Sequence, residues 1–177
     1  MKRVFILCLL LLQVIAGHAQ LQATLNVDSN PTPELSEWVN RTDLAILTVT
    51  NPSPQTTVEY RVRVSLLLEG TIKLITDETV PYMVADFGTE TFLADELIPY
   101  NAVQFIDTGF RDQISRTGLL PPGSYSFCVE LLNREGRSLT QPEQICRPMI
   151  ITDYQMPELL DPVANRLIDP ILINSIM

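Results

Sequence analysis

Carboxylates are the side chains of this 177-residue chain whose types and spacing come nearest to supporting catalysis. The only histidine, His18, lies in an N-terminal segment that we expect the mature protein to lose. Without it, no Ser-His-Asp or Cys-His nucleophile can form, and no histidine-based zinc site. Acid pairs, which suffice for glycoside hydrolysis, occur at Glu34 and Glu37 and at Asp95 and Glu96. Because adjacent residues of a strand point to opposite faces, Asp95 and Glu96 are a poor pair, and solvated surface acids are the simpler interpretation.

Other chemical motifs are missing from the sequence. It contains no glycine-rich phosphate loop and no calcium loop of the EF-hand type. The formal net charge of −9 disfavours binding to nucleic acids and to anionic membranes. We therefore expect no catalytic, cofactor-binding or metal-binding residues, and a protein that is not an enzyme.

Two cysteines, Cys128 and Cys146, lie outside the N-terminal segment, and an even number of cysteines in an exported protein indicates a disulfide. Residues 125–131 and 144–152 are both expected to be strands. The two cysteines are equally distant from the loop around residue 137, so hairpin pairing would bring them together. Cys128 falls on the face opposite Tyr125 and Phe127, which predicts a disulfide on the outer side of the sheet.

Three aromatic residues are candidates for structural or binding roles. Alternation places Tyr125 and Phe127 in the core, where the Tyr125 hydroxyl would bond nearby backbone, as in the tyrosine corner of Ig-like sandwiches. The alternative for Tyr125 is an aromatic ring that stacks on a ligand. Trp38 lies between polar residues in a loop-like region, and it is either a core residue or an exposed contact.

A period of two residues dominates the chain and indicates β-strands. The clearest predicted strands are 21–27, 44–50, 58–69, 72–80, 125–131 and 144–152, with weaker ones at 91–98 and 103–106. A helical turn is expected at 36–40, and a short helical segment at 109–116. Short strands separated by proline, glycine and asparagine predict an all-β fold, an Ig- or fibronectin III-like antiparallel β-sandwich.

The chain divides into three predicted parts. Residues 1–19 have the layout of a cleavable signal peptide, with Lys2 and Arg3 before an apolar run that is shorter than the roughly 20 residues of a membrane span. Residues 20–155 form the sandwich domain. Residues 156–177, which three prolines interrupt, are either a linker or an unpaired C-terminal strand that could add to a partner. We expect the mature protein to be secreted, periplasmic or on the outer cell surface, without a membrane span.

One region is similar to a known group of proteins. Residues 118–130 read GLLPPGSYSFCVE, and Cys146 and the PELLDP of residues 157–162 follow. This pattern resembles exported Ig/fibronectin-like domain proteins of the Bacteroidetes, of the TANFOR type. The resemblance implies an exported sandwich domain rather than a particular activity, and larger members continue into further domains after the linker.

We therefore expect a non-catalytic exported domain with a structural, adhesive or protein-interaction role, whose partners are other exported or surface proteins. One alternative is a carbohydrate-binding or carboxylate-based hydrolytic module, which would need exposed aromatic residues in a row. Its candidates are Trp38, Tyr60, Tyr82, Tyr100 and Tyr154. Another is a component of a surface assembly or secretion complex.

Overall fold

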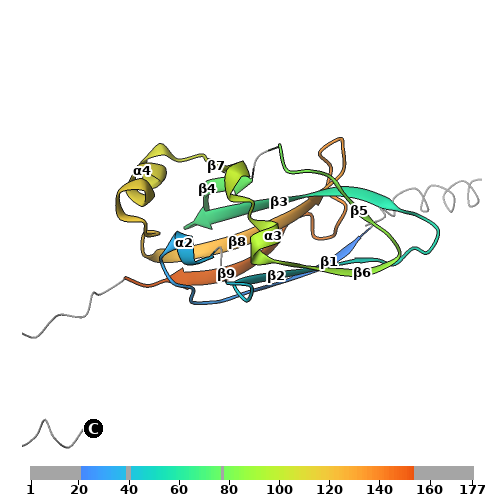
Figure 1. The fold of residues 1–177 in the computed structure, drawn as a ribbon, viewed down its shortest axis with the longest axis horizontal. Helices are drawn as coiled ribbons and strands as arrows, with labels where there is room; N and C mark the ends of the chain where they lie inside the picture. The colour runs from blue at the N-terminus through green and yellow to red at the C-terminus, as the bar shows by residue number, and fades with distance from the viewer. Residues whose placement is uncertain (1–20, 39–40, 77, 154–177) are drawn as a thin grey trace, which may run out of the picture.

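A computed structural model describes residues 21–38, 41–76 and 78–153. The predicted signal peptide at 1–19 lies outside these residues, and so does the predicted tail at 156–177. The described residues form an all-β sandwich of two antiparallel sheets with a few short helices (Figure 1), as the alternating sequence predicts.

Three strands make the first sheet, in the order β1-β2-β6. They are β1 (Gln22–Val27), β2 (Ala45–Asn51) and β6 (Gly88–Leu93). The second sheet has the order β7-β4-β3-β8-β9, and β5 pairs with β3 beyond the end of β4. Its strands are β3 (Val58–Leu68), β4 (Thr71–Thr76), β5 (Met83–Ala85), β7 (Val103–Phe105), β8 (Gly123–Leu132) and β9 (Ile145–Ile151).

The long strands β3 and β8 build the centre of the core. On β3, every second side chain from Val58 to Leu66 is buried, while Glu59, Arg61 and Arg63 on the other face are partly exposed. This is the pattern of a strand with one face against the core and one toward water. The core-facing residues of β8 lie opposite those of β3, for example Val129 opposite Val64.

Within the residues that the structure describes, four helical segments lie outside the sheets. They are α2 (Leu35–Trp38), α3 (Ala94–Leu97), the 3₁₀ helix η1 (Tyr100–Ala102) and α4 (Thr108–Thr117). The longest, α4, begins where the Asp107 carboxylate accepts a hydrogen bond from the Phe110 backbone N–H at 3.0 Å. It ends at Gly118, which has a φ of 72° and closes the helix in the left-handed conformation that glycine tolerates best.

Two strand predictions were too long. The strand expected at 91–98 ends at Leu93, because the Glu96 carboxylate accepts the Leu93 N–H at 2.9 Å and the chain turns into α3. The strand expected at 72–80 ends at Thr76. The 11-residue β3 is long enough to pair with both β4 and β5 along one edge, so the chain leaves the sheet between them.

Candidate functional site

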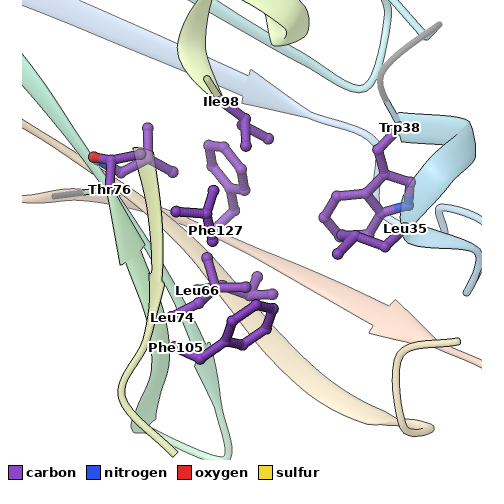
Figure 2. A pocket seen from close by; sticks show the side chains of 10 residues that line it. Leu35, Trp38, Leu66, Leu74, Thr76, Ile98, Phe105 and Phe127 are labelled. Carbon is purple, nitrogen blue, oxygen red and sulfur yellow. The ribbon is translucent and has the colours of Figure 1, made fainter. Parts of the chain in front are cut away.

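An apolar cavity of about 120 Å³ lies between the core-facing side of the second sheet and the segments α2 and Ile98 that cover it (Figure 2). Its walls come from α2, β3, β4, β7, β8 and the residue after α3, so segments far apart in the sequence meet there. The lining residues are Leu35, Trp38, Val64, Leu66, Leu74, Thr76, Ile98, Val103, Phe105 and Phe127. Thr76 is the one polar side chain among them, and its hydroxyl oxygen already accepts the Val64 N–H at 2.9 Å. The cavity therefore suits an apolar group.

Trp38 forms one wall of this cavity and is 2% exposed, which decides between the two roles that the sequence left open. Its indole N–H donates to the Thr32 carbonyl at 2.8 Å, so the polar edge of the ring is satisfied inside the protein. Leu35 lies one helical turn earlier on the same face of α2. In Figure 2 these two side chains face Phe127 and Leu66 across the cavity. Trp38 could thus touch an occupant of the cavity but not a ligand on the surface.

Phe127 and Tyr125 are both 1% exposed, and they have different surroundings. Phe127 lines the cavity. The Tyr125 hydroxyl donates to the Pro121 carbonyl at 2.8 Å, and the Tyr125 ring packs 6.5 Å from the Phe110 ring, centroid to centroid. Burial raises the pKa of Tyr125, which keeps this hydroxyl a hydrogen-bond donor. The geometry is that of a tyrosine corner, and a ring this deeply buried offers no face for stacking.

Cys128 and Cys146 are joined by a disulfide across β8 and β9, where they are direct partners with their Cα atoms 4.1 Å apart. The bond lies on the face opposite Tyr125 and Phe127, but that face is less open there than the alternation suggests. Cys128 is fully buried, and the side-chain amide of Gln144 donates to Ser65 beside it at 3.3 Å. The loop before β9 folds over the outer face and covers this position.

The outer face of β3 carries a set of charged contacts around Tyr82. The guanidinium carbons of Arg61 and Arg134 lie 5.3 and 5.2 Å from the centre of the Tyr82 ring. Arg134 also donates two hydrogen bonds to Glu59, which lowers the pKa of that carboxyl. The alternation of β3 indicates which of its charges share this face, but Arg134 and Tyr82 come from loops that no sequence period places.

A second hollow, polar and about 390 Å³ in volume, lies on this outer face. Its lining residues are Arg61, Arg63, Ile75, Thr76, Glu78, Thr79 and Gln104. Arg63 is paired with Glu130, whereas Arg61 donates to the Glu78 carbonyl at 2.7 Å and forms no ion pair with any described carboxylate. The hollow therefore offers fixed donors to a polar ligand.

The acid pairs considered for catalysis are split between the two short helices. Glu34 and Glu37 lie at α2, while Asp95 and Glu96 belong to α3, where Glu96 caps the helix. Across residues 21–38, 41–76 and 78–153, no three His, Cys, Asp or Glu side chains are grouped closely enough to hold a metal ion. None of the helices within the same ranges is both long and apolar enough to span a membrane.

The aromatic candidates do not form an exposed row where they can be described. Trp38 and Tyr60 are buried, and the Tyr60 hydroxyl lies 3.4 Å from the Glu90 carboxylate. Tyr82 is half-buried against its two arginines. The side chains of Tyr100 and Tyr154 lie outside the described part of the chain.

Comparison of the sequence with protein-family models and with curated proteins finds no match. The function must therefore be argued from the geometry of the cavity, the outer face and the disulfide.

Proposed function

We propose that this chain is a non-catalytic, exported protein-interaction domain. The observation that carries the proposal is the apolar cavity, which opens at the edge of the sandwich, where Leu35, Val103 and Phe105 are only half-buried. An apolar cavity at a surface costs free energy while it holds water or nothing, and it gains free energy when an apolar group fills it. Apolar anchors seated in pockets are what dominate protein–protein binding energies.

Two further features support an exported location. The disulfide between Cys128 and Cys146 is typical of oxidising compartments outside the cytoplasm. The resemblance of residues 118–130 to exported TANFOR-type proteins of the Bacteroidetes points to the same location. A role within a surface assembly or secretion complex is one form of this function, in which the partner is a component of that complex.

Site-specific photo-crosslinking in the organism that makes the protein tests the proposal. A photoreactive residue replaces Ile106, which is 52% exposed and follows the cavity-lining Phe105, or Phe87, which is 66% exposed and precedes β6. Gln55, in an exposed loop, is the control. We expect protein adducts at Ile106 or Phe87 and none at Gln55. Absence of adducts at both positions, with a turnover that Glu37→Gln or Asp95→Asn abolishes, would replace the proposal with a hydrolytic function.

The export part is tested separately by fractionating cells that express the full chain or a chain lacking residues 2–19. We expect the full chain outside the cytoplasm with its disulfide formed, and the shortened chain inside with free thiols. Retention of the full chain in the cytoplasm would contradict export.

The polar hollow on the outer face favours a second candidate, binding of a carbohydrate. Arg61, held by Tyr82 and the Glu78 carbonyl, and the exposed Gln104 offer donors of the kind that sugar hydroxyls accept. Binding to an array of glycans that Arg61→Ala and Gln104→Ala each weaken would support it. If both variants bound glycans as well as the wild type does, carbohydrate binding at this hollow would be rejected.

A further inference from the structure

We infer that β7 is a docking edge, to which an extended basic segment of another protein adds as a strand while one bulky apolar side chain of that segment fills the cavity. This inference rests on the proposed protein-interaction function and names the chemistry of the partner. The inference is based on a comparison of the strand edges, some of which are covered in this fold while one is open. An open edge presents unpaired N–H and C=O groups to any strand that can reach it.

The edges formed by β1 and β9 are closed against each other. The Ile150 N–H donates to the Ser29 carbonyl at 2.8 Å, and the Arg147 side chain donates to the Leu25 carbonyl at 2.9 Å. Pro148 removes one further donor from β9. An added strand would have to break these contacts.

Two other edges are protected within the described residues. The β5 edge is occupied, since the Asn51 side-chain amide donates to the Ala85 carbonyl at 3.0 Å. On β6, Glu90 lies opposite the buried Val49, so its charge projects from the core-facing side, where it approaches Tyr60. Inward-pointing charges are a device by which edge strands avoid pairing.

The β7 edge is only three residues long, but it has neither of these two protections. No described strand pairs with its outer side, and Val103, Gln104, Phe105 and Ile106 include neither a charge nor a proline. The Ile106 N–H donates to the Lys73 carbonyl, and inward and outward peptide groups alternate along an antiparallel strand. Gln104 therefore bonds toward β4, and the peptide groups of Val103 and Phe105 face the open edge.

The cavity lies where a strand added to β7 would place its core-facing side chains. Val103 and Phe105 both line the cavity, opposite the buried Thr76 and Leu74 of β4. A strand paired with β7 continues the sheet, so every second side chain of that strand points to the same side as Val103 and Phe105. The β7 edge and the cavity thus form one site, in which the edge binds the backbone of the added strand and the cavity binds one of its side chains.

The size of the cavity restricts the inserted group. An apolar cavity of about 150 Å³ takes up a benzene-sized molecule. The 120 Å³ available here matches one leucine-, isoleucine- or phenylalanine-sized side chain rather than a long acyl chain.

Charge indicates what flanks that side chain. The two short helices that border the cavity carry Glu37 and Asp95, with Glu34 just before α2, and none of these carboxylates pairs with a described cation. The whole chain has a net charge of −9. Basic residues beside the apolar anchor would complement this rim and speed association at low salt.

The test uses the mature chain, residues 20–177, and a fluorescent nine-residue peptide of sequence KTKTLTKTK, titrated by anisotropy. We expect saturable binding that weakens with added salt and weakens at least about tenfold when alanine replaces the central leucine. Val103→Phe, which fills the cavity, should weaken binding to a similar degree. Val84→Phe, the same change at an exposed valine of β5, is the matched control and should bind normally.

Backbone pairing has its own signature, which no change in the protein's folding can imitate. Two peptides, one N-methylated on the odd-numbered amides and the other on the even-numbered amides, should differ sharply in affinity. Only one of the two sets of amides faces β7, and methylation of that set removes the hydrogen bonds to the strand. NMR shifts of the protein backbone should concentrate at Val103–Ile106. Loss of binding with both methylated sets or with neither, or shifts centred on another strand, would overturn the inference.

Other occupants give distinct results, and each would also overturn it. Uptake of benzene without peptide binding would mean a small-molecule cavity, and concentration-dependent shifts at β7 without peptide would mean a second copy of this chain. If crosslinks form in the organism at Phe87 while the peptide fails to bind, the proposed function stands and the β7 site falls. If no protein crosslinks form at either position, both fall.

Discussion

At the scale of single residues, the Tyr125 hydroxyl should be worth more to stability than the equally buried Tyr60 hydroxyl. Tyr125→Phe keeps the ring but leaves the Pro121 carbonyl without its 2.8 Å donor, so we expect a loss of about 1 kcal/mol in the free energy of unfolding. Tyr60→Phe is the matched control, since its hydroxyl contact with Glu90 is 3.4 Å long, and it should cost less. Urea titrations measure both, and an equal or reversed order would contradict the role of the tyrosine corner.

The disulfide is the other residue-scale contribution. Its cysteines are 18 positions apart, and closing a loop of this length in the unfolded chain should stabilise the fold by roughly 3 kcal/mol. The Cys128→Ser/Cys146→Ser variant should therefore unfold at a clearly lower urea concentration. The wild type under reducing conditions should behave like this variant, and a reduced protein as stable as the oxidised one would show that the bond constrains little.

At the scale of elements, one carboxylate links the start of α4 to the sheet, in addition to the packing of the Phe110 ring on Tyr125. Asp107 caps the helix and lies 2.7 Å from the Lys73 ammonium of β4. The hydrogen bond from Lys73, and after it the one from the Phe110 N–H, lower the pKa of Asp107. A carboxyl whose pKa is lower in the folded state stabilises the protein above its unfolded pKa and loses that contribution as the pH falls through the folded value.

Stability should consequently decline with falling pH below about pH 4, the region of an unfolded aspartate. Asp107→Asn retains a capping side chain but removes the ion pair, so it should weaken this pH dependence. Asp112→Asn on the same helix changes the same charge at an exposed pair with Arg111 and serves as the control. Urea titrations between pH 3 and pH 6 measure the free energy of unfolding. If this free energy depended on pH in the same way in the wild type and in Asp107→Asn, the predicted contribution of the Asp107 ion pair would be contradicted.

The elements also show how far the sequence alone can lead. Strands with a strict two-residue period, such as β3 and β8, are recognisable because alternation sets burial directly. The end of β6 at Leu93 was missed because a single capping contact from Glu96 decides it. The disulfide could be expected because Cys128 and Cys146 are equally distant along the chain from the loop around residue 137. The cavity could not, since its lining residues come from five elements and the residue after α3, and in sequence they are ordinary core residues.

At the scale of the whole molecule, the described core is closed within residues 21–151. Every member of its buried apolar cluster lies between Leu21 and Ile151. The two ends of this stretch are tied to the rest by backbone hydrogen bonds, from Leu21 to Leu139 and from Ile150 to Ser29. We therefore predict that residues beyond β9 add little to the packing of this sandwich.

Deleting residues 158–177 should therefore leave the thermal unfolding temperature almost unchanged. We expect a shift smaller than the roughly 4 °C that a loss of 1 kcal/mol causes in a domain of about this size. Solubility should improve, because the deleted sequence is rich in Leu and Ile, including Leu167, Ile168, Ile171, Leu172 and Ile173, and unpaired apolar segments promote association.

A longer deletion from Ile145 onward is the control for that experiment. It removes β9 and Cys146, which leaves β8 without one of its two neighbouring strands and without its disulfide, so it should abolish cooperative unfolding. Differential scanning calorimetry distinguishes the three proteins. A fall of many degrees after the short deletion would mean that the C-terminal residues pack on the sandwich, and the domain boundary predicted near residue 155 would then be wrong. An unchanged melt with better solubility would place the boundary just after β9 and make residues 20–157 the unit for structural work on the cavity and the β7 edge.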